Sequence, residues 1–399
     1  MALFDGLFNR QPQKLVLESP QDKIFNDVAE TIKLGAIDLP KPVESKYRDW
    51  VTFGQNNQFP LELIEYRNSS ALHAAILESK SMLIAGEGLM FAETEEESRA
   101  WLLQNYTKVP FVHKLNYVWS QVVNDQETFG YSCFEVIYSM DHTKILDLNW
   151  VDASRIASGK MNERGQITEY FYSENWKNIN QTPPVKIEAF DPNNTTSHRQ
   201  LVFIRRQESN MDYFGLPSYY SALKWIKADS LMAEYNLAAI SNGFSPSIVF
   251  KFFKKPTPEE RRIIVEGIKG QHGGPRNAGK AIFLFSDGKE LAPEVQTLDV
   301  TNLDNRLLQV ADQIVQQIIS GHRAYPQLQG ILVSGKLGLS NEMVQSWKIF
   351  DTMVIKPEQE FILQHFRNAL RYNGVDRLEV KKLVPIDLQP DAQAPQNIN

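Results

Sequence analysis

Cysteine is almost absent from this sequence. Cys133 is the single cysteine among 399 residues, which excludes an internal disulfide framework and a zinc site built from cysteines. The scarcity suits a reducing compartment. Because Cys133 falls in a segment with the alternation of a strand, we interpret it as a packing residue and not as a nucleophile.

Long apolar runs are also missing. No run approaches the roughly 18 residues that a membrane-spanning helix requires, so no membrane partner is expected. The first ten residues are apolar, but Asp5 interrupts them and no signal-peptide core follows. We interpret them either as a short amphipathic arm that docks on another subunit or as a loosely ordered terminus.

An excess of positive charge is missing as well. Lysine and arginine number 42 against 48 aspartates and glutamates, which gives a formal net charge of −6. Proteins that wrap nucleic acid depend on neutralising its phosphates, so this balance argues against such a protein. It does not argue against a protein that DNA merely passes through.

Signatures of catalysis and metal binding are incomplete. Residues 274–280 match the phosphate loop G-x-x-x-x-G-K, but the next position, which needs Ser or Thr to hold Mg²⁺, is Ala281. The segment also precedes a predicted strand instead of following one, so we interpret it as a flexible loop. The seven histidines show no metal-ligand spacing, and His322 beside Arg323 is interpreted as a basic group at a helix end. We therefore expect no metal, no cofactor and no enzymatic activity.

The first half of the chain predicts an α+β fold, in which helices precede a small antiparallel sheet. Helical periodicity covers residues 61–85, 95–105 and 114–126, and strand alternation covers residues 131–138, 145–151, 167–172 and 201–205.

The second half predicts two long helices with a small unit between them. Residues 217–243 are helical and apolar around much of their circumference, so several neighbours must cover that helix. A strand at 248–253, a helix that starts at Thr257 with a capping box to Glu260, and a strand at 281–285 follow. This strand–helix–strand unit is an inserted module at the end of a helical hairpin.

The stretch from 303 to 373 predicts a helix, a loop and a longer helix. The first helix ends at Gly321, where a left-handed stop would suit glycine. Residues 330–339 form an apolar, glycine-rich loop, and Ser340 is a good N-cap for a helix that kinks at Pro357. Because the loop is apolar, it is poorly suited to exposure to water, and because it is rich in glycine, it is too flexible for an ordinary core.

These elements resemble, in their order and spacing, the portal proteins of tailed double-stranded DNA bacteriophages, particularly the compact portals of the HK97-like group. The motifs that carry the resemblance lie at residues 213–223, 242–249, 277–284 and 340–342, at Gly330 and Pro357, and at the terminal residues 3–8. The resemblance covers most of the chain. Its departures are Ser247, where glycine is common, the insertion-like residues 178–197, and a C-terminal tail too short for a large crown.

The resemblance implies a ring-forming portal fold with a defined series of parts. The parts are an N-terminal arm and extended region at 1–60, an α+β wing at 61–216, a stem helix at 217–243, a clip at 244–298, a second stem helix at 299–320, a tunnel loop at 321–340, a long kinked wing helix at 341–374, and a short, partly disordered tail at 375–399.

The resemblance also implies a structural function. The family forms rings, usually of twelve subunits, at one capsid vertex of the virion, and the ring would assemble in the host cytoplasm. DNA enters through the ring, driven by the terminase motor, and leaves through the tail. The implied partners are further copies of the chain, the large terminase subunit, the major capsid and scaffolding proteins, a head–tail adaptor, and double-stranded DNA without sequence preference. Two alternatives stay open: a nucleotide-dependent nucleic-acid enzyme that uses residues 274–280, or another phage head structural protein without a channel.

Three groups of site residues follow from the resemblance. The tunnel loop would present Val333, Ser334, Gly335, Lys336, Leu337 and Gly338. The stem helices would use Leu223, Trp225, Ile226, Leu231, Tyr235, Leu307, Val310 and Ile314. The clip would meet the terminase or an adaptor through Lys254, Lys255, Glu259, Glu260, Arg262, Arg276 and Lys280. In a ring each helix has two neighbours, which explains an apolar circumference.

Lys336 is the one charged residue of the glycine-rich loop, so we expect it to project into the channel and to meet phosphates transiently. Lys336→Glu should therefore alter DNA retention or packaging in a packaging assay, whereas Lys336→Arg, which keeps the charge, should not. Unchanged retention and packaging by the glutamate variant would contradict this role.

Overall fold

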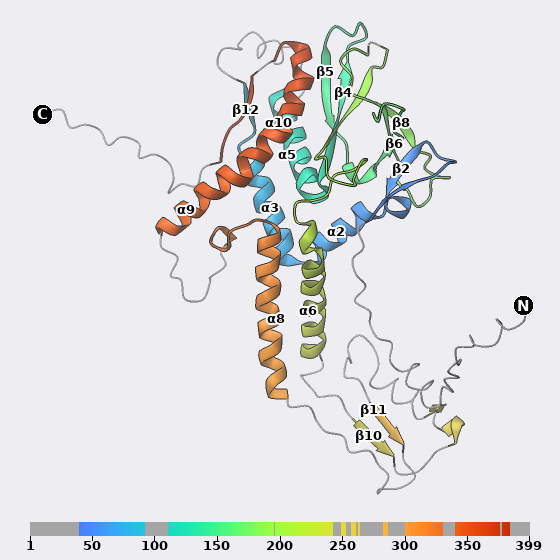
Figure 1. Cartoon of the computed structure of the whole chain (residues 1–399), viewed down its shortest axis with the longest axis vertical. Coiled ribbons are helices and arrows are strands. Elements are labelled where there is room, and N and C mark those ends of the chain that lie inside the picture. Colours follow the sequence, from blue (N-terminus) through green and yellow to red (C-terminus); the bar gives the residue numbers. More distant parts are fainter. Residues whose placement is uncertain are drawn as a thin grey trace, which may run out of the picture. The chain divides into compact units, whose positions relative to one another are not determined.

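The computed structural model describes residues 40–91, 111–194, 196–241, 249–252, 257–260, 262–263, 282–285, 300–329, 340–375 and 377–383. These residues form helices and a large sheet, so the predicted α+β class is confirmed (Figure 1). The helix predicted at 95–105 and the glycine-rich loop at 330–339 lie outside the described residues. No helix of the described part is long and apolar enough to cross a membrane.

The main sheet is larger than the small antiparallel sheet that the sequence predicted. Its strands are β1 (Pro42–Glu44), β2 (Trp50–Phe53), β4 (Tyr131–Tyr138), β5 (Ile145–Trp150), β6 (Ile156–Gly159), β7 (Glu169–Tyr172), β8 (Val185–Ala189) and β9 (Arg199–Arg205). They lie in the order β1-β2-β6-β7-β8-β9-β4-β5, antiparallel except for the parallel pair β8–β9. Strands β1, β2, β6 and β8 were missed, because three to five residues each are too few to show a clear alternation.

Three helices build the core beside this sheet: α3 (Ala71–Ala85), α5 (Phe111–Phe129) and α10 (Lys356–Leu370). The ring of Phe366 on α10 stacks on Phe134 of β4 at 4.3 Å and meets Trp119 of α5 edge-on at 5.4 Å between centroids. All three side chains are fully buried. Helix α2 (Phe59–Ser69) precedes α3, and the hydroxyl of Ser70 caps α3 by accepting a hydrogen bond from the backbone N–H of His73.

A second, two-stranded sheet joins distant parts of the chain. Strand β12 (Leu378–Val380) pairs antiparallel with β3 (Leu89–Phe91). The sequence placed residues from 375 onward in a tail, yet Val375 and Leu378 are fully buried in the core. Nearby, the side chain of Asn373 makes two hydrogen bonds to Ile145, the first residue of edge strand β5. Its Oδ1 accepts from the Ile145 N–H at 2.7 Å, and its Nδ2 donates to the Ile145 carbonyl at 2.8 Å.

The long C-terminal helix is interrupted where the sequence predicted a kink. Helix α9 (Ser340–Phe350) continues into a π-helical turn, Asp351–Ile355, and then into α10. Pro357 stands in the first turn of α10. Proline has no backbone N–H to donate, so the regular α-helical hydrogen-bond pattern is broken before Pro357. The wider π-helical turn in the preceding residues accommodates this break.

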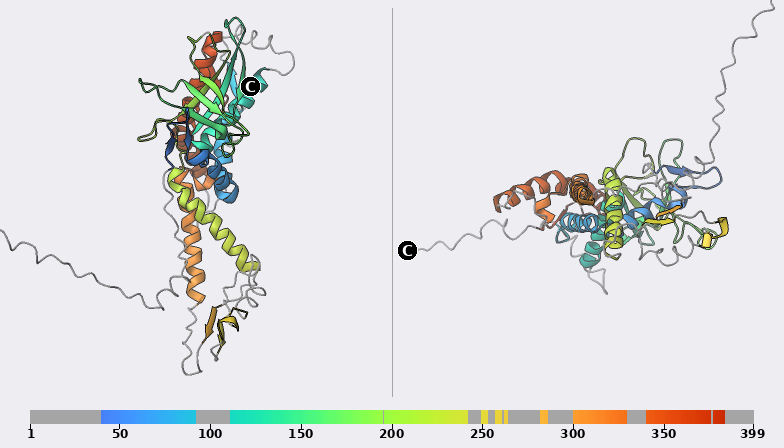
Figure 2. Two further views of the ribbon diagram at one scale, coloured as in Figure 1. Left: turned by 90° about the vertical axis from the view of Figure 1, so that its right-hand side faces the viewer. Right: turned by 90° about the horizontal axis from the view of Figure 1, so that it is seen from below.

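A helical hairpin extends from the sheet and its helices. Helix α6 (Leu223–Ser241) and helix α8 (Val300–Gly321) lie side by side, and they diverge away from the end where α6 begins (Figures 1 and 2). Both helices were predicted from the sequence. A short 3-10 turn, Tyr220–Ala222, leads into α6.

Gly321 has a different role from the one that the sequence predicted. It is the last residue of α8 and does not take a left-handed conformation; Arg323, with φ of 55°, does. A Cβ at Gly321 would lie 2.4 Å from the Cβ of Ala222. Glycine is therefore required because the two helices approach each other here without room for a side chain.

The predicted elements of the inserted module are present where the structure describes them. Strands β10 (Val249–Phe252) and β11 (Ile282–Phe285) form a parallel pair. Thr257 and Glu260 make the predicted capping box: the Thr257 N–H donates to the Glu260 carboxylate at 2.9 Å, and the Glu260 N–H donates to the Thr257 hydroxyl at 3.4 Å.

The contact at Gly321 leads to a stability prediction. Gly321→Ala should lower the free energy of unfolding by about 1–3 kcal/mol, because the added methyl group must push α6 and α8 apart. Urea or thermal unfolding of both proteins would measure it. Ser320→Ala, on an exposed position of the same turn, should change stability by less than about 0.5 kcal/mol. Equal stability of Gly321→Ala and wild type would contradict the close approach.

Candidate functional site

The α6–α8 hairpin carries the predicted stem residues, and they divide into two groups. Those nearest the sheet are packed: Leu223, Ile226 and Ile314 are buried, and Trp225 and Leu307 are half-buried. Those farther out are exposed: Leu231, Tyr235 and Val310 are 42%, 49% and 42% accessible. Leu237 and Leu308 add to this group. Exposed apolar residues on two adjacent helices are typical of a surface that contacts another protein molecule.

At the base of the hairpin, two histidines from distant parts of the chain meet. Nδ1 of His73 on α3 lies 2.8 Å from Nε2 of His322, just past the end of α8. One nitrogen donates and the other accepts, so the accepting ring must be neutral in this pair. The ring of Tyr219 stacks on His322 at 4.8 Å and meets His73 edge-on at 4.5 Å. All three side chains are fully buried.

The surroundings favour the neutral form of both imidazoles. Burial, with a further contribution from the positive charge of Arg67, lowers the pKa of His73 to about 4. Burial also holds the pKa of His322 well below its usual range, and the His73 and Lys80 charges act in the same direction. His322 is thus not the basic helix-end group that the sequence suggested; it is a neutral core residue.

A buried ion pair lies close to the same joint. Nζ of Lys80 on α3 lies 2.7 Å from the Glu127 carboxylate on α5, and each side chain is 3% accessible. The Lys80 ammonium also donates to the hydroxyl of Ser218 at 3.1 Å, and the Tyr219 hydroxyl donates to the carbonyl of Thr128 at 2.6 Å. Ser218 and Tyr219 directly precede the turn that leads into α6, so these contacts attach the start of α6 to α3 and α5. Removal of either Lys80 or Glu127 would leave the other charge buried without a partner.

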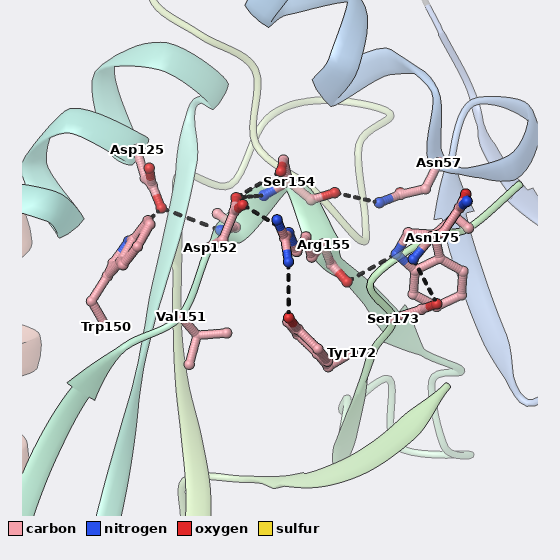
Figure 3. A network of polar contacts seen from close by, with 12 residues as sticks. Asn57, Asp125, Trp150, Val151, Asp152, Ser154, Arg155, Tyr172, Ser173 and Asn175 are labelled. Atoms are coloured by element: carbon pink, nitrogen blue, oxygen red, sulfur yellow. Dashed lines mark hydrogen bonds and ion pairs between the residues drawn. The ribbon is translucent and has the colours of Figure 1, made fainter. Parts of the chain in front are cut away.

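The main sheet carries a concave pocket of about 520 Å³. Val151, Val185 and Ile187 supply apolar walls. The charged lining residues are already paired: Arg155 with Asp152 at 3.1 Å, and Arg199 with Glu135 at 2.7 Å. Figure 3 shows Arg155 between Asp152 and the hydroxyl of Tyr172, to which it donates at 3.2 Å.

Beside the pocket, Asp125 is a buried acid. Its Oδ2 accepts hydrogen bonds from the indole of Trp150 at 2.8 Å and from the N–H of Ala153 at 3.2 Å (Figure 3). Burial raises the pKa of Asp125 to about 8, against the opposing effect of these hydrogen bonds. One donor is the last residue of β5 and the other lies in the turn that follows it, so Asp125 fixes one wall of the pocket, and we assign it a structural role.

The remaining predicted site residues are only partly described. The tunnel-loop residues Val333 to Gly338 and the clip residues Lys254, Lys255, Arg276 and Lys280 lie outside the described residues, as does the loop at 274–280. Glu259, Glu260 and Arg262 are exposed, and Arg262 lies 3.7 Å from Glu259. In the part of the chain that the structure describes, no group of three or more His, Cys, Asp or Glu side chains could hold a metal ion.

Sequence reasoning missed the His73–His322 pair, because 249 positions separate the two residues. A signal was present in the helix pattern. His322 continues the buried row of Ile314 and Ile318 at four-residue spacing, and His73 belongs to the buried face of α3 with Ile76 and Leu77. Histidines that continue an apolar row are to be read as core residues.

Comparison with known proteins bears on the fold. No protein-family model matches the chain, and no curated protein matches its sequence. Two solved structures are similar over most of their length. One is the virion of a native gene transfer agent particle, with 14% identity, coverage of 84% of this chain and 85% of that chain, and a TM-score of 0.51. The other is the neck of an empty particle of this kind, computed with C6 symmetry, with 15% identity, coverage of 83% and 85%, and a TM-score of 0.51. The fold is shared with a chain of a virion neck.

The low histidine pKa values predict acid sensitivity. Below pH 6.5 the unfolded chain binds protons that folded His73 and His322 do not, because burial lowers the pKa of both imidazoles. Their contribution to stability is therefore present above pH 6.5 and is lost as pH falls; for His73 the loss extends to about pH 4. His322→Gln should flatten this dependence by up to about 1.4 kcal/mol per pH unit. Urea unfolding at several pH values would measure it, and measurements at pH 7.5 give the packing loss separately. An unchanged slope would contradict the buried neutral pair.

Proposed function

We propose that this chain is the subunit of a portal ring, a conduit at one vertex of a phage-like particle. The observation that carries the proposal is the α6–α8 hairpin, whose outer part exposes Leu231, Tyr235, Leu237, Leu308 and Val310 in the single protomer. A helix pair of this kind is completed by copies of itself. The shared fold with a chain of a virion neck, in a particle computed with C6 symmetry, supports a place in a cyclic assembly of a virion.

The finer details of the proposal rest on the sequence resemblance. The ring has twelve subunits and connects head and tail. Double-stranded DNA enters through it under the terminase motor and later leaves through it. The chain has no catalytic activity of its own, and the ATPase belongs to the terminase. The net charge of −6 supports a conduit that does not hold DNA by nonspecific attraction.

Imaging of the purified full chain tests the proposal. We expect annular particles with a central hole in negative-stain top views, and a particle mass that gives the subunit number. A filament or a closed particle would overturn it. ATP hydrolysis measured separately on the ring and on the terminase should be confined to the terminase; hydrolysis by the ring alone would favour the nucleotide-dependent enzyme.

A surface variant tests the interface assigned to the hairpin. Leu231→Glu should weaken self-association by at least about tenfold, because the charge would be buried without a partner. Met140→Glu places the same charge at a residue that is 86% accessible in the turn after β4, outside the hairpin, and should leave assembly unchanged. Circular dichroism would confirm that both variants fold, and equal assembly of the two would contradict the interface.

A further inference from the structure

Helix α8 carries one continuous exposed face of uncharged polar side chains. Gln309, Gln313, Gln316 and Ser320 are all exposed. Their spacing of four, three and four residues places them in a single row along the helix. Asp312 is exposed at the edge of this row. We call these four residues the glutamine row.

The two flanks of the glutamine row are both apolar. At 3.6 residues per turn, successive residues are about 100° apart, so Leu308 and Val310 lie about 100° to either side of Gln309. They are 66% and 42% accessible. The opposite side of the helix holds Ile314 and Ile318, which are buried. Helix α8 thus has a buried back, a polar front and one exposed apolar residue on each side, with exposed Gln317 beside Val310.

We propose that α8 forms the inner wall of the ring, with the glutamine row facing the DNA and with Leu308 and Val310 packed against the neighbouring copies. This placement rests on the proposed portal function and adds which helix, and which face of it, lines the channel. A twofold dimer buries the same patch on both molecules and would leave one flank in water. A head-to-tail ring covers both flanks with two different neighbours.

The width of such a wall agrees with passage of DNA. Helices packed side by side have axes about 8–10 Å apart. Twelve of them in a circle, each about 10 Å thick, leave a passage of about 25 Å, which admits a duplex. Six would leave about 8 Å, which is narrower than the roughly 12 Å width of the major groove and so too narrow for the whole duplex. A wall in which α6 and α8 alternate would be much wider than the duplex.

The chemistry of the two helices separates them further. The amide and hydroxyl groups of the glutamine row neither attract nor repel phosphates strongly, and Asp312 at its edge cannot attract them, so DNA can slide past. The exposed side of α6 carries Lys224, Lys227 and Glu234 beside Leu231 and Tyr235. Charges of this kind would hold or repel the backbone at each step. Helix α6 is therefore assigned to the subunit contacts and not to the lumen.

DNA threading tests the placement. Gln313→Arg puts a ring of positive charges where the duplex passes, so the purified ring should retain linear duplex DNA at least about tenfold better at low salt. It should not retain covalently closed circular DNA, which has no end to thread. Asn236→Arg adds the same charge to an exposed position of α6 and should show no preference for linear DNA. Equal retention of closed circles by Gln313→Arg, or a linear preference of Asn236→Arg, would overturn the placement.

Disulfide cross-linking tests the flanks. The double variant Leu308→Cys/Val310→Cys should give, on oxidation, a ladder of covalent oligomers up to the ring size, whereas each single variant should stay monomeric on a denaturing gel. Wild type, whose Cys133 is buried, gives the background. An intact annulus without a ladder would overturn the placement of α8 and leave the portal function standing. Absence of any annulus would overturn the portal function itself.

Discussion

The close approach of α8 to the start of α6 is the constraint on which the hairpin depends. Gly321 meets Ala222 with no room for a side chain, and one residue later His322 enters the core to pair with His73. The buried pair of Lys80 and Glu127 joins α3 to α5, and Lys80 also donates to Ser218 in the segment before α6. Both long helices therefore leave the core from one tightly packed joint, and their directions are set there.

Packing around this joint explains why the outer hairpin is apolar without being buried. A helix pair that diverges from its point of contact cannot bury its own inner faces along its whole length. Beyond the joint, Leu231, Leu237 and Leu308 remain in water unless other molecules cover them. The sequence predicted an apolar surface around much of residues 217–243, and in the proposed ring this surface would serve contacts between protomers.

Much of the fold could be predicted from the sequence, and the failures have physical causes. Strand β4 and helices α3, α5, α6 and α8 are long enough to show their periodicity, and the capping box of Thr257 is a local signal. Strands β1, β2, β6 and β8 are too short to do so, and their pairing is decided by partners far along the chain. Gly321 was misjudged because helix ends are the commonest place for glycine, whereas the reason here is a contact with Ala222.

The candidate site could be predicted only in part. The apolar positions of both stem helices follow from helical spacing, but the same spacing cannot tell a residue packed within the protomer, such as Ile226, from one left exposed, such as Tyr235. That distinction depends on where the helices leave the core. Likewise, the environment of His322 depends on His73, and no local pattern links residues so far apart.

The two hydrogen bonds of Asn373 to edge strand β5 have a consequence for a chain that, as proposed, assembles from many copies. An open sheet edge invites the strands of another molecule and leads to aggregation. Asn373 already occupies the outward N–H and carbonyl of Ile145, so a foreign strand cannot begin pairing there. In the proposed ring, neighbouring protomers would therefore meet through their helices, and the open edge of the large sheet would not draw them into strand pairing.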